Sequence, residues 1–367
     1  MAVCYKDILS IDKMIDVYKN IRSNTCHKEK LVRFELAFCC NLTTILEKLE
    51  NKTYQHQSYQ LFLISIPKYR IIMSETIPDK IVNHLISKYI LLPSLIPKLI
   101  EMNVATRTGK GTKAGIEYTK KYIHYMKQNH KKVYALKCDI KKYFYHIDHE
   151  ILLYKLRHDI HDLDVIELLE KIITSTDQTY VNQYIDLLIE RETKRLQKQK
   201  CPDQHRLEEL SKIPRYKKGK GLPIGNETSQ ILAIYYLNSL DHYIKEQLHI
   251  KCYVRYMDDF ILFHHDKDYL KQCLVKIKQE LKSLKLSLNR KTQIYDLEKG
   301  FNFLGYKFVL KNKKLLILLN NQTKKKIKKK LRRLKKHQAS NYQAVKTSYQ
   351  GYFQVANTKH FLYRSKF

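Results

Sequence analysis

Two adjacent carboxylates, Asp258 and Asp259, lie between two apolar runs, and this feature limits the possible folds more than any other. The runs 252–257 and 260–263 are short and rich in β-branched and aromatic residues, which predicts two strands joined at the acid pair. Adjacent like charges repel each other, and burying them is costly unless a cation compensates. The pair is therefore either a divalent metal site or an ordinary polar hairpin.

A third carboxylate, Asp139, ends another apolar run at 133–139, which also predicts a strand. Magnesium takes oxygen ligands and bridges carboxylates to substrate phosphates. Three acids on neighbouring strand ends would hold two Mg²⁺ ions roughly 4 Å apart, and such a pair activates one oxygen and stabilises the leaving one in phosphoryl transfer. On this interpretation Asp139, Asp258 and Asp259 form one site.

The chain carries a formal charge of +33, from 69 Lys and Arg against 36 Asp and Glu. So large an excess favours a polyanionic partner, with nucleic acid as the first candidate and an acidic membrane surface as the second. Residues 301–367 alone contain 18 Lys and Arg and no Asp or Glu. More than half of the net charge therefore lies in the last fifth of the chain.

Within that region, Ile327, Leu331 and Leu334 are spaced at i, i+4 and i+7, which predicts one apolar stripe on a helix over 323–337. The remaining surface of this helix is cationic, so it can pack on the protein while presenting charge to a phosphate backbone. A solvated face and a membrane-surface helix are the alternatives. We favour nucleic-acid contact through the cations Lys325, Lys329, Arg332 and Lys336.

The rest of the composition argues against several classes of protein. No stretch approaches the roughly 20 apolar residues that a membrane-spanning helix needs, and the N-terminus lacks the features of a secretion signal. The eight cysteines are scattered without the spacing of a zinc site, so we interpret them as reduced thiols. We therefore expect a cytoplasmic chain with no membrane partner, and leave open a homo-oligomer or an accessory protein.

The 367 residues are enough for two or three subdomains around a sizeable core. Residues 5–50 show helical spacing of apolar positions, and 59–72 turn to short strand-like runs. A highly charged stretch at about 186–213 predicts an exposed helical excursion.

A basic loop broken by glycines, 107–113, leads into another helical pattern. Its cations Arg107 and Lys110 either touch a phosphate or belong to a solvated turn.

Five motifs between residues 136 and 306 occur in the order of the palm motifs of reverse transcriptases, and the chain resembles that family. The motifs are Leu136-Lys-Cys-Asp139, Gly221-Leu-Pro-Ile-Gly225, Tyr256-Met-Asp-Asp259, Leu288-Asn-Arg-Lys291 and Phe303-Leu-Gly-Tyr306. Upstream, Ile66-Pro-Lys68-Tyr-Arg70 resembles the fingers motif of the bacterial enzymes. The resemblance implies an α+β right-hand polymerase with fingers, a palm built on an antiparallel sheet, and a helical thumb.

On this basis we expect an N-terminal helical region at 1–50, fingers at 51–135, a palm at 136–310 with a charged insertion near 186–213, and a basic helical thumb at 311–367.

The resemblance also implies roles for residues at the matching positions. Asp139, Asp258 and the main-chain carbonyl of Ile140 would bind the two Mg²⁺ ions, with Asp259 supporting the site. Lys291 would approach the pyrophosphate leaving group as an electrostatic stabiliser or proton donor.

Lys68 and Arg70 would bind the triphosphate, because cations neutralise charge that moves during phosphoryl transfer. Phe144 would lie under the sugar of the incoming nucleotide and exclude a 2′-hydroxyl, which makes DNA the expected product; the alternative is a core phenylalanine. Gly225 and Gln230 would also line the nucleotide site. Phe303, Gly305 and Tyr306 would form the primer grip.

One motif departs from the common pattern. Ile224 stands where many reverse transcriptases have glutamine, and Gln230 follows Ser229 where many have proline. Isoleucine removes a side-chain hydrogen bond to the nucleotide, so we expect base or sugar discrimination to be altered. The pattern resembles reverse transcriptases of diversity-generating retroelements and of antiviral defence, and the charged excursion and Glu227 favour the defence type.

The predicted function is therefore an RNA-directed DNA polymerase that extends DNA on a structured non-coding RNA template, using dNTPs and Mg²⁺, in antiviral defence. A diversity-generating retroelement enzyme and non-templated or protein-primed DNA synthesis are the alternatives within enzymes. From another class, a non-catalytic RNA-binding protein on a decayed palm is the alternative, against which the intact Asp139, Asp258, Asp259, Phe144 and Lys291 argue.

Overall fold

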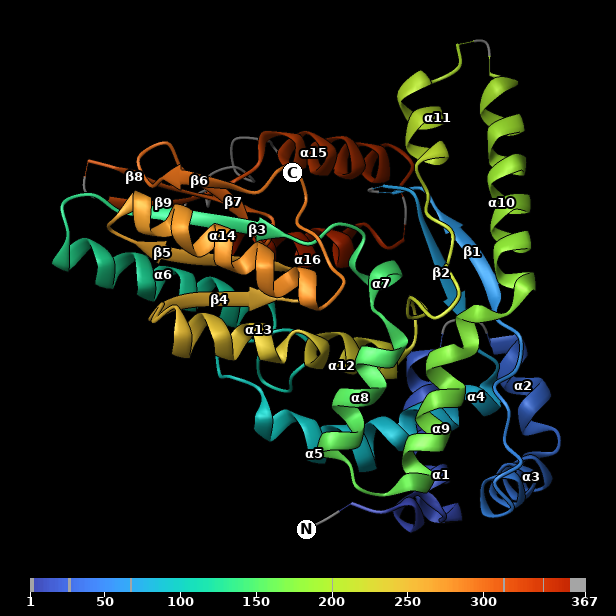
Figure 1. Ribbon diagram of the computed structural model, residues 1–367. Coiled ribbons are helices and arrows are strands. Elements are labelled where there is room, and N and C mark those ends of the chain that lie inside the picture. Colours follow the sequence, from blue (N-terminus) through green and yellow to red (C-terminus); the bar gives the residue numbers. More distant parts are fainter. Residues whose placement is uncertain are drawn as a thin grey trace. The chain divides into compact units, whose positions relative to one another are not determined.

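The structure is a computed structural model that describes residues 3–25, 28–66, 68–199, 201–312, 314–338 and 340–356. The chain forms two compact units. Unit 1 comprises Met1–Ile100, Lys141–Asp241 and Glu280–Ser287, and unit 2 comprises Glu101–Ile140, His242–Gln279 and Leu288–Phe367. Helices and antiparallel sheets are combined in one chain, which confirms the predicted α+β class (Figure 1). The predicted division at residues 50, 135 and 310 stays a prediction.

Unit 1 is mainly helical. A typical start is that of α4, where the Thr76 hydroxyl accepts a hydrogen bond from the Asp79 amide and Pro78 occupies the first turn. The helices of this unit are α1 (Ile11–Asn24), α2 (Lys28–Glu35), α3 (Phe38–Glu50), α4 (Ile77–Ile86), α5 (Leu92–Leu95), α7 (Tyr143–His146), α8 (His149–Asp159), α9 (Leu163–Ile173), α10 (Thr179–Gln197), α11 (Gln204–Ser211) and α12 (Glu227–Tyr236).

One strand hairpin in unit 1 is formed by β1 (Gln60–Ile64) and β2 (Arg70–Ser74), which pair antiparallel. Alternate residues such as Leu61, Ile71 and Met73 are buried, because successive side chains in a strand point to opposite faces. The helices α10 and α11 supply the other side of this small core (Figure 1). The helical excursion predicted near 186–213 is confirmed as the second half of α10 together with α11.

Unit 2 is built on a four-stranded antiparallel sheet with the strand order β4-β5-β3-β6. The strands are β3 (Tyr134–Asp139), β4 (Cys252–Tyr256), β5 (Asp259–His264) and β6 (Gln293–Asp296). A tight turn at Met257 and Asp258 joins β4 to β5, so the hairpin predicted at the acid pair is confirmed.

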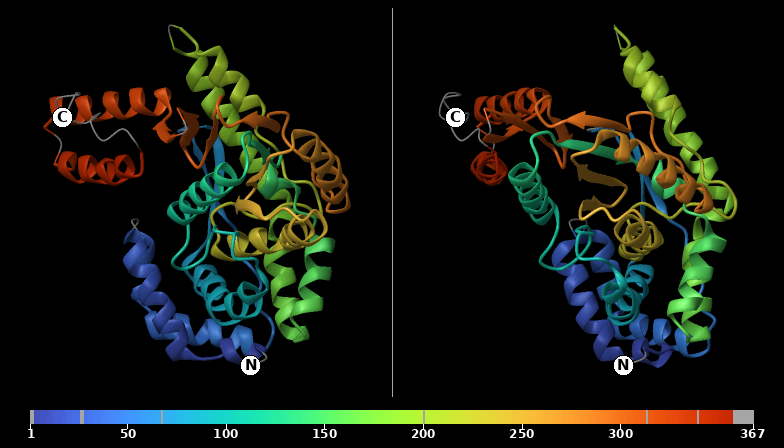
Figure 2. Two further views of the ribbon diagram at one scale, coloured as in Figure 1. Left: turned by 90° about the vertical axis from the view of Figure 1, so that its left-hand side faces the viewer. Right: turned by 60° about the vertical axis from the view of Figure 1, so that its left-hand side comes forward.

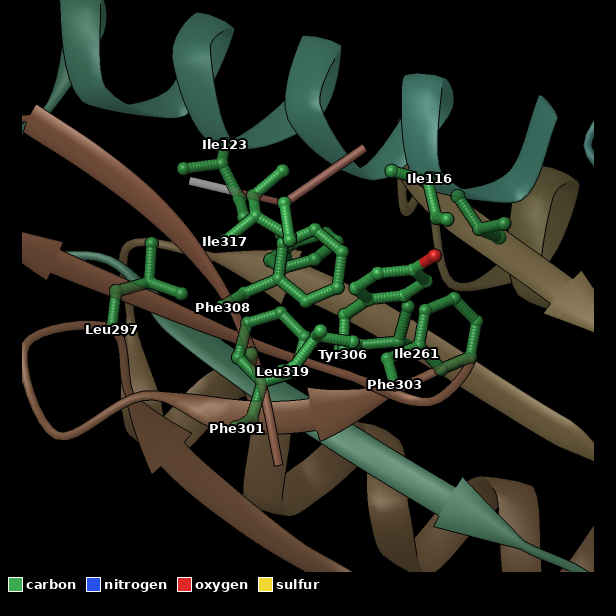
Figure 3. Packing of buried hydrophobic residues seen from close by; sticks show 14 of the residues in the cluster. Ile116, Ile123, Ile261, Leu297, Phe301, Phe303, Tyr306, Phe308, Ile317 and Leu319 are labelled. Carbon is green, nitrogen blue, oxygen red and sulfur yellow. The ribbon is translucent and has the colours of Figure 1, made fainter. Parts of the chain in front are cut away.

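A second, three-stranded sheet of unit 2 consists of β7 (Phe301–Phe303), β8 (Tyr306–Lys311) and β9 (Lys314–Leu319). Residues 314–319 were expected in a helical thumb, but their run of consecutive apolar residues pairs with β8 instead. Side chains from this sheet, from α6 (Thr112–Asn129) and from β5 form one core, to which Ile116, Phe301 and Phe308 belong (Figure 3).

The remaining helices are α13 (Asn238–His242), α14 (Lys267–Ser283), α15 (Asn321–Lys336) and α16 (Tyr342–Gln354). The basic helix predicted at 323–337 is confirmed as α15, which lies beside α16 (Figure 2). Residues 348–357 resemble the end of the thumb of bacterial reverse transcriptases, and the last of them, Asn357, lies outside the described residues. Among the helices that the structure describes, none has the length and apolar character to cross a membrane.

Candidate active site

The three predicted carboxylates lie at one end of the four-stranded sheet. Asp139 is the last residue of β3, Asp259 is the first of β5, and the two are directly opposite each other in the strand register. Residues that are paired across two strands point to the same face of the sheet. Two positions after Asp259, the same face carries Ile261, which is buried in the core. Asp258 occupies the turn, where its main-chain carbonyl accepts a hydrogen bond from the Ile140 amide at 3.2 Å. The structure therefore brings Asp139, Ile140, Asp258 and Asp259 together.

Asp259 is in an environment that disfavours its charge. Burial raises the pKa of Asp259 to about 7; Lys137 opposes this shift, whereas Asp139 and Asp258 add to it. The Lys137 ammonium lies 3.3 Å from Oδ2 of Asp259. Oδ1 of Asp259 is buried without a hydrogen-bond partner, a state that costs about 1–3 kcal/mol. A bound cation would relieve both the charge repulsion and the missing partner.

Asn289 holds Asp139 in place through two hydrogen bonds. Its side-chain Nδ2 donates to Oδ2 of Asp139 at 2.9 Å, and its main-chain amide donates to the Asp139 carbonyl at 2.7 Å. The Asn289 side-chain oxygen accepts a hydrogen bond from the Lys291 amide at 3.3 Å. Lys291 is exposed and belongs to the same turn as Asn289, directly before β6.

A buried arginine supports the turn between β4 and β5. The side chain of Arg255 is fully buried, and its guanidinium donates to the Met257 carbonyl at 3.0 Å. Met257 has φ of 56°, a left-handed conformation that costs a residue with a side chain roughly 1–2 kcal/mol. The hydrogen bond from Arg255 therefore stabilises the strained turn that presents Asp258.

The oxygen donors at this end of the sheet fit a hard divalent cation such as Mg²⁺. In the part of the chain that the structure describes, no group of three or more His, Cys, Asp or Glu side chains is already arranged as a metal site. Two of the oxygens have protein partners, since Asp139 accepts from Asn289 and Asp259 faces Lys137. The buried acceptor Oδ1 of Asp259 is left for a cation to satisfy, so the residues present fit the Mg²⁺ ions that the resemblance implies.

In unit 1, the loop before α12 is bonded to two segments that carry predicted nucleotide contacts. The Leu222 amide donates to the carbonyl of Phe144 in α7, and the Met73 amide of β2 donates to the Ile224 carbonyl, both at 2.8 Å. Gly225 has φ of +138°, and a Cβ there would lie 2.5 Å from the Met73 carbonyl oxygen. Only glycine fits this close approach between loop and strand.

The two predicted triphosphate ligands, Lys68 and Arg70, are both exposed, whereas Tyr69 between them is buried. Arg70 begins β2 and Lys68 lies in the connection just before it, so both cations face solvent at this end of the β1–β2 hairpin. Gln230 is exposed on α12, and Phe144 is half-buried. These residues and Gly225 belong to unit 1, whereas the carboxylates belong to unit 2.

The predicted nucleic-acid contacts on α15 are all exposed and lie on one face, at i, i+4, i+7 and i+11. They are Lys325, Lys329, Arg332 and Lys336. Ile327 and Leu331 are buried on the opposite side. The predicted combination of an apolar stripe with a cationic face is therefore present.

Two predicted primer-grip side chains lie in the core instead of at the surface. Phe303 and Tyr306 are 1% and 3% exposed, and the Tyr306 hydroxyl donates to the Tyr352 carbonyl at 3.0 Å. Only Gly305 in the turn between them is exposed, with φ of +85°. The aromatic residues of this motif hold the turn through packing. The structure therefore does not support direct contact between their side chains and the primer.

The basic loop before α6 is tied to itself. Arg107 donates to the Asn103 carbonyl at 3.2 Å, and Lys110 donates to the Glu101 carbonyl at 2.6 Å. Part of the donor capacity of both cations is therefore used within the loop, which favours the turn interpretation over phosphate contact.

Three residues around the carboxylates were not assigned from the sequence: Lys137, Asn289 and Arg255. Lys137 is two positions before Asp139 and therefore on the same strand face, a signal that strand periodicity offers. Arg255 is a charged residue inside an apolar run, which is unusual enough to be recognised. Asn289 lies within a recognised motif, but nothing local links it to Asp139, which is 150 positions away.

An antiparallel sheet that carries an acid pair on a hairpin and a third acid opposite it defines the palm of a nucleic-acid polymerase. Residues 65–308, about two-thirds of the chain, match the family model described as reverse transcriptase (RNA-dependent DNA polymerase). The chain belongs to this family. The match confirms the predicted polymerase fold and the predicted class of enzyme, a nucleotidyltransferase.

No curated protein sequence matches the chain. Among solved structures, telomerase from Candida albicans in complex with the TWJ fragment of telomeric RNA is similar with a TM-score of 0.47 and 13% identity, over 80% of this chain and 52% of that one. Apo telomerase from Candida tropicalis, truncated from its C-terminal domain, has a TM-score of 0.47 and 16% identity, over 70% and 54%. The chain thus spans about half the length of these two proteins.

Proposed function

We propose that this chain is an RNA-directed DNA polymerase that extends DNA on a structured non-coding RNA template by two-metal nucleotidyl transfer. The observation that carries the proposal is the family match over 65–308, combined with Asp139 and Asp259 facing each other beside Asp258. The 3′-hydroxyl of the primer attacks the α-phosphorus of a dNTP; one P–O bond forms, another breaks, and pyrophosphate leaves.

Asp139, Asp258 and the main-chain carbonyl of Ile140 would bind two Mg²⁺ ions, with Asp259 supporting them. When bound, the ions supply Lewis-acid stabilisation of the attacking and leaving oxygens. Asn289 fixes the direction of Asp139, and Arg255 stabilises the turn that carries Asp258.

Other residues of the chain would act on the nucleotide. Lys68 and Arg70 bind the triphosphate, and Lys291 stabilises the pyrophosphate or donates a proton to it. Phe144 lies under the sugar and excludes a 2′-hydroxyl, so that dNTPs are selected. Gly225 and Gln230 also line the nucleotide site, and the missing side chain of Gly225 admits the close approach of the loop to β2.

The cationic face of α15, together with the exposed turn at Gly305, would contact the template and the DNA product. These exposed cations stand on a helix whose opposite side is packed, so their charge is free to attract a phosphate backbone.

We further propose a role in antiviral defence, supported by the Ile224 and Gln230 pattern and by the excursion formed by α10 and α11. Phage-infection assays with cells that carry or lack the gene test this step. Protection that persists with Asp258→Ala would separate the defence role from polymerisation.

The polymerase proposal is tested with purified protein, an RNA template with a DNA primer, dNTPs and Mg²⁺. Incorporation should occur in the wild type and be lost in the double variant Asp258→Ala with Asp259→Ala. Asp268→Ala is the matched control, because Asp268 is an exposed acid of the same unit that pairs with Lys271 at 2.7 Å. Incorporation that survives the double substitution would refute the assignment, and a product complementary to no supplied RNA would favour non-templated synthesis.

A further inference from the structure

The helices α10 and α11 have no role in the site described so far, and their packing indicates one. They cover one face of the β1–β2 hairpin (Figure 1), and Ile71 and Met73 belong to the same buried core as Val181 and Ile185 of α10. Arg70, the first residue of β2, and Lys68, in the connection just before it, are both exposed. The two helices therefore lie directly behind the strand of the predicted triphosphate ligands.

Tyr69 is the residue that links this strand to the helices. It lies between the two cations in sequence and is itself buried, with 8% of its surface exposed. Its hydroxyl donates to Oε1 of Glu192 in α10 at 2.7 Å. The guanidinium of Arg206 in α11 lies over its ring, 5.1 Å from the centroid. Both helices therefore hold the same side chain.

Glu192 is itself fixed by an arginine of its own helix. Nε of Arg195 donates to Oε2 and Nη2 donates to Oε1, both at 2.6 Å. Such two-point pairs fix the carboxylate plane as well as its charge. The hydrogen bond from Arg195 lowers the pKa of Glu192 most, so the carboxylate stays ionised. Tyr69 thus donates to an oriented, charged acceptor.

The same helix also supports the loop that leads to Gly225. Asn182 of α10 exchanges two hydrogen bonds with the main chain of Tyr216, at 2.8 and 2.9 Å. The Tyr216 hydroxyl donates to the Leu222 carbonyl at 3.2 Å. Ile224 of the same loop is bonded to β2, so α10 supports the loop that connects the two main-chain segments with predicted nucleotide contacts.

We propose that the α10–α11 hairpin positions the nucleotide-binding strand, with Glu192 acting through Tyr69 to set the direction of Lys68 and Arg70. Tyr69 directly precedes β2 and lies between the two cations in sequence, so releasing its side chain allows both cations to leave the nucleotide together. The inference rests on the proposed function, because it takes Lys68 and Arg70 as triphosphate ligands. Glu192 and Tyr69 are positioning residues and touch no substrate.

Steady-state dNTP incorporation tests the inference with Tyr69→Phe, which removes one hydroxyl, and Glu192→Gln, which removes one charge. A hydrogen bond to a charged group is worth enough to change an equilibrium about tenfold. We expect the KM for dNTP to rise about tenfold in each variant while kcat changes little. The double variant should be no worse than the stronger single variant, because both act through one bond.

Glu190→Gln is the matched control. Glu190 lies on the same helix, is exposed, and pairs at 2.5 Å with Lys194. Its replacement removes the same charge without touching Tyr69, so the KM should stay at the wild-type value.

Amide hydrogen exchange of residues 70–74 in nucleotide-free protein provides a readout that needs no activity. Exchange should be faster in Tyr69→Phe and Glu192→Gln than in wild type and in the control. An unchanged KM with unchanged exchange in both variants overturns the inference. A wild-type chain that incorporates no nucleotide overturns the proposed function instead, and the exchange result for β2 still decides whether Glu192 holds the strand.

Discussion

Replacing Arg255 by methionine removes the guanidinium and keeps a stem of similar shape in a fully buried position. A hydrogen bond from a charged donor contributes about 1.5–3 kcal/mol, and the left-handed Met257 stores roughly 1–2 kcal/mol of strain. The two quantities are comparable, so the bond at 3.0 Å offsets the strain of the turn. We expect Arg255→Met to lower the free energy of unfolding by at least about 2 kcal/mol.

Loss of this bond should reduce activity more than stability alone explains. If the turn relaxes, Asp258 moves, and a displacement of about 1 Å at a reacting group costs roughly 100-fold in rate. The assay is kcat for dNTP incorporation, measured well below the melting temperature of each variant. Leu270→Ala is the control: Leu270 is fully buried in α14, and its truncation costs about 2–5 kcal/mol without touching the turn.

Two results would refute this reasoning. Arg255→Met with a wild-type kcat despite lost stability would show that the guanidinium does not position the acids. The second test uses Met257→Gly, since glycine adopts a left-handed conformation without strain. In that background Arg255→Met should cost about 1 kcal/mol less; an equal cost in both backgrounds would show that strain at Met257 is not what the bond opposes.

Four further outcomes are expected. Phe144→Ala should raise the kcat/KM for ribonucleotides relative to dNTPs by roughly 10- to 200-fold, measured by competitive incorporation, because the pocket gains room for the 2′-hydroxyl. Mg²⁺ should raise the melting temperature of the wild type but not of Asp258→Asn, since a cation relieves repulsion among buried acids. Burial raises the pKa of Glu75. Burial by itself would lower the pKa of His56, but the nearby carboxylates Glu75 and Asp79 outweigh this effect, so the pKa of His56 is also raised. Both groups bind protons more tightly when folded, so wild-type stability should fall relative to Glu75→Gln as the pH rises above the ordinary glutamate pKa of 4.5 in denaturant titrations. RNA affinity should fall steeply from low to moderate salt in filter-binding assays, and a flat response would contradict the electrostatic role of α15.

Local patterns allowed the parts of the site that depend on neighbours in sequence to be predicted. The hairpin at Asp258 follows from two apolar runs that flank the acids. The helix α15 follows from three apolar residues at helical spacing within a cationic run. In both cases the signal that specifies the element is contained in about a dozen residues.

Contacts between distant segments could not be predicted in this way. Tyr69 and Glu192 are 123 positions apart, and Asn289 and Asp139 are 150 apart. A tyrosine in a strand or a glutamate on a charged helix has many possible partners, and only the folded chain selects one. The strand β9 was missed for a related reason: a run of apolar residues without alternation is compatible with either a helix or a strand, and its pairing with β8 decides.

The motif aromatics show that a recognised position does not specify how a residue acts. Phe303 and Tyr306 occupy the primer-grip motif, yet both side chains are buried among core residues (Figure 3). What the motif presents to solvent is the turn at Gly305, where a Cβ would lie 2.5 Å from the Tyr352 hydroxyl. Sequence comparison identifies such a position, but burial decides whether its side chain or its main chain meets a ligand.

Charge balance explains how the fold tolerates three acids at the edge of an apolar core. Asp139, Asp258 and Asp259 carry three negative charges when ionised, and Lys137 at 3.3 Å from Asp259 contributes one positive charge. The donors from Asn289 and from the Ile140 amide satisfy oxygens without adding charge. Two negative charges remain, which one divalent ion would neutralise; the phosphates of the nucleotide would balance the second ion. Lys137 therefore reduces the repulsion among the acids in the ion-free site while leaving enough negative charge to bind the metal. A neutral residue at position 137 would destabilise the folded, ion-free protein.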